Sequence, residues 1–235
     1  TSGFGISATS GAIEVLASDN TTIRADAGGF AIGLARSSGG GAGSLSIGAS
    51  VSNNDVGGSD NFVKAYVVGS SLSASGNVTI QATNNITIGA LAMGGALSGS
   101  SGDGLTGALA GAGAGSTNTS DVDVLAYSDS NTTITAGGNV QIQSTDTSTI
   151  TADAGGVAIS VARGGVGGSL SIGASRSNNT ITTVVNAYAK NTDIDATGNL
   201  AITASSTATI DALAIAGSLA GVSAEGLAVS GAGSG

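Results

Sequence analysis

The amino-acid sequence predicts an all-β fold, an elongated parallel β-helix (β-solenoid) built from repeats of about sixty residues. Three observations predict it. The chain repeats itself, its apolar residues alternate with small or polar ones, and Gly and Asn punctuate the alternating runs. A stack of long antiparallel β-hairpins is an alternative interpretation, and the pattern alone does not separate the two.

The longest internal match joins the two halves of the chain. The segment Ala25–Arg36 returns as Ala152–Arg163, an offset of 127 residues (152 minus 25). The offset then falls to 125 for Ser44–Ser50 against Ser169–Ser175 (169 minus 44). Length changes of this kind fall in loops, here in Gly-rich and Asn-rich stretches. The match indicates duplication of a longer unit.

A finer repeat lies inside the first. Gly-Asn pairs stand at Gly76-Asn77, Gly138-Asn139 and Gly198-Asn199, with spacings of 62 and 60 (138 minus 76 and 198 minus 138). Tyr66, Tyr127 and Tyr188 keep a spacing of 61 (127 minus 66 and 188 minus 127). We therefore expect a single array of modules at approximately 1–65, 66–127, 128–187 and 188–235. It begins and ends in mid-module, which is expected of a fragment of a longer chain.

Within a module, the strands are expected where β-branched residues alternate. In chain order these runs are 78–80, 86–88, 122–124, 134–136 and 140–142. Sixty residues divide naturally into about three turns of roughly twenty, the usual turn of a parallel β-helix. In the hairpin alternative, 86–98 and 105–114 are joined at 101–104. In either case faces of Gly and Ala let sheets approach closely and favour self-association.

Composition excludes several classes of function. The 235 residues contain no His, Cys, Pro or Trp, so triads based on His or Cys, zinc sites built on these residues and disulfides are absent. Asp and Glu alone could act as acid and base, and no acidic cluster recurs beside an aromatic subsite, so we expect no enzyme. The formal charge of −9 argues against binding nucleic acid and against anionic membranes, and we expect no membrane insertion.

The repeat motifs resemble a known group of proteins. The pattern is carried by 185–188 (VNAY), 194–204 (IDATGNLAITA) and 212–216 (ALAIA). It resembles the repeats of giant secreted bacterial filamentous adhesins of the leukotoxin type, and its Gly-Asn element is similar to the repeats of filamentous haemagglutinins. The resemblance covers nearly the whole chain and implies a β-helix at the bacterial cell surface, in an extracellular fibre, stalk or biofilm adhesin. It supplies no catalytic residues.

Two sets of charged residues are candidate sites. Pairs at Asp121 and Asp123 and at Asp193 and Asp195 could ligate Ca²⁺ through carboxylate oxygens. Solvated strand faces are the favoured interpretation, so no cofactor is expected. The matched residues Asp26, Arg36, Asp153 and Arg163 predict Arg to Asp contacts that join neighbouring turns of the solenoid, with a ligand site as the weaker alternative.

Other motifs carry less weight. Gly102–Gly107 matches the letters of a dinucleotide fingerprint, but no helix pattern follows, so a plain turn is expected. The tyrosines could stack on sugars, although packing in the core or between turns is favoured. Threonines at 132–135, 147–151 and 207–209 suggest an ice-binding face, but their spacing is irregular.

The expected function is structural. We expect a segment of an extracellular bacterial filament or adhesin stalk that assembles with copies of itself or neighbouring repeats. A module that binds a surface glycan or receptor is the alternative, and an ice-binding protein is a weaker one.

Overall fold

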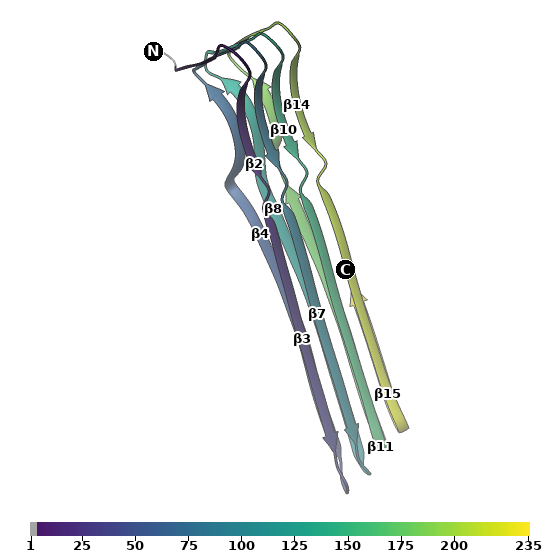
Figure 1. Cartoon of the computed structure of the whole chain (residues 1–235). Coiled ribbons are helices and arrows are strands. Elements are labelled where there is room, and N and C mark those ends of the chain that lie inside the picture. Colours follow the sequence, from purple (N-terminus) through teal and green to yellow (C-terminus); the bar gives the residue numbers. More distant parts are fainter. Residues whose placement is uncertain (1–3) are drawn as a thin grey trace.

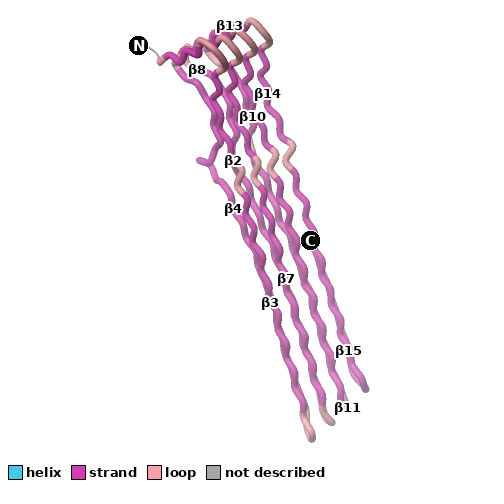
Figure 2. The backbone as a smooth tube through the Cα atoms, viewed as in Figure 1, coloured by secondary structure: helices cyan, strands magenta, loops and turns pink. Residues whose placement is uncertain are grey.

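The computed structural model describes residues 4–235, apart from the side chains of Ser59 and Ala224. Its regular structure is all strand, arranged in four stacked coils that follow one path (Figures 1 and 2). The first two coils consist of β1 (Gly5–Ala8), β2 (Ile13–Asp19), β3 (Thr22–Arg36) and β4 (Ala42–Val68), then β5 (Ser71–Ala74), β6 (Val78–Asn84), β7 (Thr87–Ser101) and β8 (Leu105–Asp129). The last two consist of β9 (Thr132–Ala136), β10 (Val140–Asp146), β11 (Thr149–Thr182) and β12 (Val185–Ala189), then β13 (Thr192–Ala196), β14 (Leu200–Ser206) and β15 (Thr209–Ser234).

Strand pairing between successive coils is parallel and in register. Val140 of β10 pairs with Val78 of β6 on one side and with Leu200 of β14 on the other. The same register holds in the long strands, where Ile150 of β11 lies between Ile88 and Ile210. We call each set of residues aligned across the coils a row. The predicted parallel β-solenoid is confirmed.

The predicted division of a module into three short turns is wrong. One module of about sixty residues forms one coil, since pairing partners lie 62 residues apart at Val78 and Val140 (140 minus 78). The hairpin alternative has the path right, because β7 and β8 run in opposite directions and are joined at 102–104. Their hydrogen-bond partners, however, are strands of neighbouring coils, in parallel.

Each coil has a short head and a long arm (Figure 1). The arm is formed by a first limb, which runs away from the head, and a return limb. The first limbs are β3, β7, β11 as far as Arg163 and β15 as far as Ser223, and the return limbs follow the tip turns. With 15 residues, β7 is about 50 Å long at roughly 3.3 Å per residue.

The head contains the conventional apolar core. The first two inward positions of β6 and of β10 are β-branched, and Val78, Ile80, Val140 and Ile142 are fully buried. Leu72 of β5 and Ile134 of β9, which belong to the neighbouring sheet of short strands, pack against this core. The alternation that predicts these strands therefore also predicts which of their faces is inside.

The arm has an interior of small residues. Most of its buried positions are Gly, Ala and Ser, with alanine clusters around Ala96, Ala158 and Ala154. Serine hydroxyls join the two limbs: the Ser44 and Ser98 hydroxyls are hydrogen bonded at 2.6 Å, and those of Ser160 and Ser169 at 2.7 Å. Backbone approach makes larger side chains impossible here.

Glycine is required where the limbs are closest. A Cβ added to Gly94 would lie 2.0 Å from the carbonyl oxygen of Gly113 on the return limb. In the next coil, a Cβ on Gly156 would lie 2.2 Å from the carbonyl oxygen of Ala174. The small-residue faces therefore pair with each other inside each coil. The expected close approach of Gly and Ala faces is therefore found, between the two limbs of one coil.

Candidate functional site

The Gly-Asn motif forms an asparagine ladder along the turn before β6, β10 and β14. The backbone N–H of Asn139 donates to the side-chain oxygen of Asn77 at 2.8 Å, and the N–H of Asn199 donates to that of Asn139 at 2.8 Å. A Cβ on Gly138 or Gly198 would lie 2.3 Å from the asparagine oxygen of the coil before it. This geometry explains the motif as a device that fixes coil register.

A second ladder of amides is buried in the return limb, and the sequence pattern did not single it out. The Asn54 amide donates to the Asn118 side-chain oxygen, and the Asn118 amide donates to Asn179, both at 2.7 Å. A related buried group joins the Asn84 amide to an oxygen of Asp146 at 3.0 Å. The recurrence of Asn54, Asn118 and Asn179 at spacings of 64 and 61, close to the module length, was the available signal. Buried polar rows of this kind favour one register over others.

The three tyrosines form a stacked ladder on the outer surface of the head. The ring centroids of Tyr66 and Tyr127 are 5.3 Å apart, and those of Tyr127 and Tyr188 are 4.9 Å apart, with planes within 11° and 8° of parallel. The prediction that the tyrosines pack between coils is therefore confirmed. The alternative that they pack in the core is wrong, because Tyr66 and Tyr188 are exposed. Neighbouring rings cover one another's faces, which leaves little area for a sugar to stack on.

Burial within this ladder raises the pKa of the Tyr127 phenol above its ordinary value of 10.0. The phenols of Tyr188 and Tyr66 raise this pKa further, as does the Asp129 carboxylate. All three neighbours disfavour a negative charge on Tyr127.

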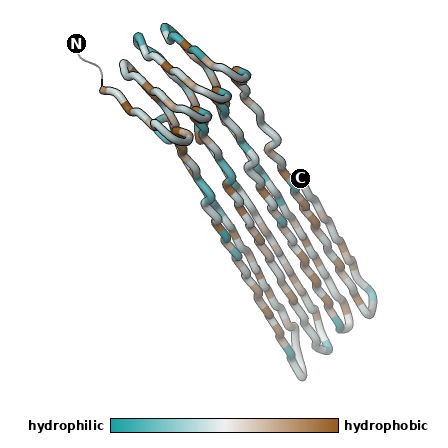
Figure 3. The backbone as a smooth tube through the Cα atoms, turned by 45° about the horizontal axis from the view of Figure 1, so that its top comes forward, coloured by the Kyte–Doolittle hydropathy of each residue, from teal (hydrophilic) through white to brown (hydrophobic). Residues whose placement is uncertain are grey.

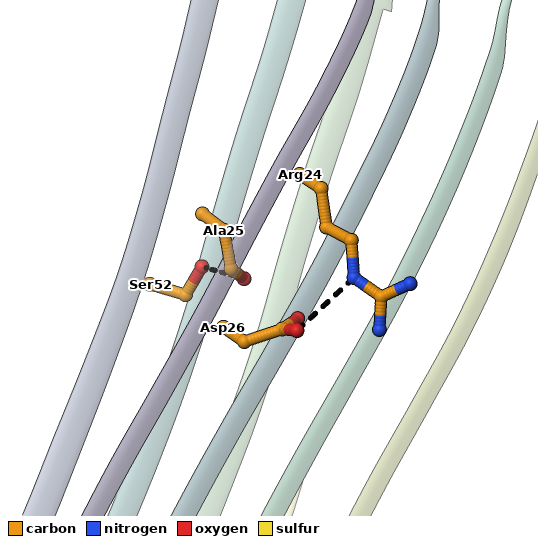
Figure 4. Close-up of polar contacts among 4 residues, drawn as sticks. All are labelled: Arg24, Ala25, Asp26 and Ser52. Atoms are coloured by element: carbon orange, nitrogen blue, oxygen red, sulfur yellow. Dashed lines mark hydrogen bonds and ion pairs between the residues drawn. The ribbon is translucent and has the colours of Figure 1, made fainter.

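The predicted Arg to Asp contacts between coils are not formed. Asp26 and Asp153 share a row with Leu91, whereas Arg36 and Arg163 share a row with Ser101, ten residues farther along the limb. The ion pair found in the described residues joins Arg24 and Asp26 of the same strand, Nε to Oδ2 at 3.0 Å (Figure 4). Figure 4 also shows Ser52 of the return limb, whose hydroxyl donates to the Ala25 carbonyl at 2.9 Å.

The acidic pairs do not form one site. Asp121 and Asp123 lie on β8, and Asp193 and Asp195 lie on β13 in a different sheet. The Asp123 carboxylate instead accepts a hydrogen bond from the Val184 N–H at 3.2 Å. Within residues 4–235, no three acidic side chains gather as a metal site would need.

The dinucleotide-like motif is a turn, as expected. Gly102 and Gly104 lie at the arm tip, and the chain continues into strand β8. Threonines do form one row across β3, β7, β11 and β15, and the Thr149 and Thr209 hydroxyls lie 3.2 Å apart. The next outward row mixes Arg24, Gly89, Thr151 and Asp211, so no regular threonine lattice covers this sheet.

The outer surfaces of the arm carry the large apolar side chains, and the brown segments in Figure 3 mark the hydrophobic residues along it. This arrangement is the reverse of the head, and sequence reasoning missed it, although the alternation was visible. Exposed apolar residues lie outward on both limbs: Phe30, Ile32, Leu34, Met93, Val157, Ile215 and Leu219 on the first, and Leu45, Ile47, Leu109, Ile172 and Val229 on the return limb. Apolar surface of this extent is typical of an interaction surface.

Comparison with family models, with curated proteins and with solved structures finds no match to this chain. No helix long and apolar enough to cross a membrane occurs within residues 4–235.

Proposed function

We propose that this chain is a structural segment of an extracellular bacterial filament or adhesin stalk, which grows by adding coils in the same register. Filament formation, the extracellular location and the bacterial origin all belong to this proposal. The repeat motifs that resemble secreted filamentous adhesins support the location and origin. The structure supports the stacking.

One observation carries the proposal. Val140 and Ile142 of the third coil are fully buried, whereas their row partners in the fourth coil, Leu200 and Ile202, are 49% and 40% exposed. These positions are apolar in every coil, and a coil stacked on β14 would cover more of their surface in the last one. Burial of a side chain of this size contributes about 1.5 to 3 kcal/mol.

The first coil is a suitable partner for the fourth. Odd coils resemble one another, as do even coils: the row of Phe30 continues as Gly95, Val157 and Gly217. A first coil placed on a fourth coil continues this alternation of large residue and glycine. Two copies of the chain can therefore stack end to end without a change of pattern.

The backbone of β14 offers the pairing groups. The Val140 N–H donates to the Asn199 carbonyl of the next coil, so by register the Leu200 N–H points away from the third coil. Residues of a parallel strand alternate in direction, so the Ala204 N–H points the same way. Such an unpaired edge is a template for another strand.

An edge variant tests the proposal. Ala204→Pro removes an outward N–H and places a ring against the incoming strand, whereas Ala204→Ser keeps the N–H and serves as the control. In sedimentation velocity at rising concentration, we expect end-to-end oligomers of the unaltered chain and of Ala204→Ser, and loss of them in Ala204→Pro. Equal oligomer content in all three, or none in the unaltered chain, would contradict stacking.

A further inference from the structure

We propose that the outward face of the first limb binds the same face of a second copy, with the two arms antiparallel and related by a two-fold axis parallel to the stacking direction. This lateral contact is distinct from end-to-end stacking and does not depend on it. The interface face consists of the outward rows from Asp26 to Arg36. It is a specific part of the apolar surface described above.

The first support is the distribution of charge on this face. One end carries Asp26 and Asp153, the other carries Arg36 and Arg163, and the rows between them are uncharged. Among the described residues, neither arginine forms an ion pair within the chain, and Asp153 forms none. The two-fold axis passes midway between these ends, so Asp153 of one copy faces Arg163 of the other, and Arg163 faces Asp153.

The second support is the match of large residues with glycines. The axis that pairs these charges also places the row of Leu34 opposite the row of Gly28. Coil by coil, the residues that face each other are Leu34 and Gly28, Gly99 and Met93, Val161 and Gly155, and Gly221 and Ile215. In these two rows a large side chain meets a glycine in all four coils, and in the two central rows Phe30 faces Ile32 and Val157 faces Ile159.

The depressions at Gly28 and Gly155 are open, whereas the Leu34 side chain partly covers Gly99, 2.9 Å from where a Cβ would be. A Cβ added to Gly28 or Gly155 would have no heavy atom within 4 Å. At the arm tip, a depression of about 470 Å³ lies around Ser101 between Arg36 and Arg163. The same axis places Leu91 of the second copy opposite Ser101. Shape and charge therefore select one arrangement of the two copies.

The return limb lacks the paired charges of the first limb. Its outward row through Leu45 contains Leu109, Leu170 and Val229, with a large residue in every coil. The return limb of the third coil carries Arg176 but no acidic residue that could pair with it in a second copy. Shape alone would allow a two-fold contact there, because the row of Gly43, Gly107 and Gly168 lies beside that of Leu45, so the paired charges decide between the two limbs. We therefore assign the contact to the first limb.

The area suits a weak dimer that strengthens with length. Ten residues along the strand and four coils give a footprint of roughly 33 by 19 Å, or about 1,200 Å² for both copies together, at the lower limit for stable interfaces. Each further coil in register adds to the footprint in proportion. Stacked arrays would therefore associate side by side more strongly than single chains.

Cross-linking between copies tests the contact directly, because the chain contains no cysteine. We would prepare Gly155→Cys and Val161→Cys separately and treat each, and their mixture, with a bismaleimide of about 10 Å span, the usual separation of packed sheets. Positions 155 and 161 face each other across the axis, whereas each lies about 20 Å from its own counterpart. We expect cross-linked dimers in the mixture and few in the single-variant samples. Equal yields in all three samples, or none in the mixture, would overturn the proposal.

Charge reversal gives a second test. Asp153→Arg and Arg163→Asp should each lower self-association several-fold, and the two variants mixed together should restore it, as should both changes in one chain. An apolar control compares Val157→Glu with Ile172→Glu, because these residues lie on the two limbs of β11 and are 50% and 53% exposed. Only Val157→Glu should weaken the dimer. Equal weakening by both, or flotation with neutral phosphatidylcholine vesicles in place of cross-linking, would contradict pairing of two copies.

Discussion

The side-chain oxygen of Asn77 accepts a hydrogen bond from the backbone N–H of Asn139, 62 residues later (139 minus 77), at 2.8 Å. Asn139 repeats the contact with Asn199. A motif that is local in sequence thus acts between coils. It holds each turn above its counterpart, and each glycine before it leaves room for the asparagine oxygen.

Asn139→Ala should lower the free energy of unfolding by about 1 kcal/mol, since the Asn199 N–H loses its acceptor. Urea unfolding followed by circular dichroism measures the loss. Asn139→Asp keeps an acceptor oxygen and should lose less. If the two variants are equally destabilised, the hydrogen bond is not the cause.

Gly94→Ala should destabilise the chain by about 2 kcal/mol or more, because its Cβ would collide with the Gly113 carbonyl oxygen. Gly113→Ala is a matched control in the facing strand, where an added Cβ meets nothing within 4 Å. The control should change stability by less than about 0.5 kcal/mol. Similar melting temperatures for the two variants would show that the limbs are farther apart than described.

Asn118→Ala should cost about 2 to 3 kcal/mol, because it leaves the buried amide of Asn54 and the half-buried amide of Asn179 without their partner. Thr117→Ala changes the adjacent outward residue and should be close to neutral. Chemical unfolding of both variants gives the comparison. A loss at Thr117 as large as that at Asn118 would argue against a buried amide row.

The tyrosine ladder should make stability fall above pH 10. Because the pKa of Tyr127 is raised in the folded state, the unfolded chain loses this proton first as pH rises through 10. This contribution is fully present below pH 10 and is lost as pH rises through the folded-state pKa. Absorbance titration at alkaline pH should show one tyrosine ionising late, and Tyr127→Phe should remove that step. Three tyrosines titrating together at the ordinary pKa would contradict the ladder.

The sequence predicted the head better than the arm, for a physical reason. Period two shows which residues share a face but not which face is inside. In the head, β-branched residues such as Val78 and Ile80 fill the core, as the usual rule assumes. In the arm, the limbs are too close for them at Gly94 and Gly156, so small residues are inside and large ones outside.

The charged residues illustrate a second limit. Spacing showed that Asp26 and Arg36 recur, ten residues apart, as Asp153 and Arg163, but it could not show that each pair lies on one continuous strand. Once each module is one coil, the two acids share a row and the two arginines share another. Their repeated spacing then fits a contact between two copies better than a contact within one.

Cryo electron microscopy of the chain at rising concentration and physiological salt tests the central claim most directly. Four coils at the strand spacing make each copy about 19 Å thick along the stacking axis. We predict filaments with an axial repeat near 4.8 Å, the spacing of stacked strands, and arms that project from the filament axis. Particles that remain single flat plates at every concentration would contradict a structural role based on coil stacking.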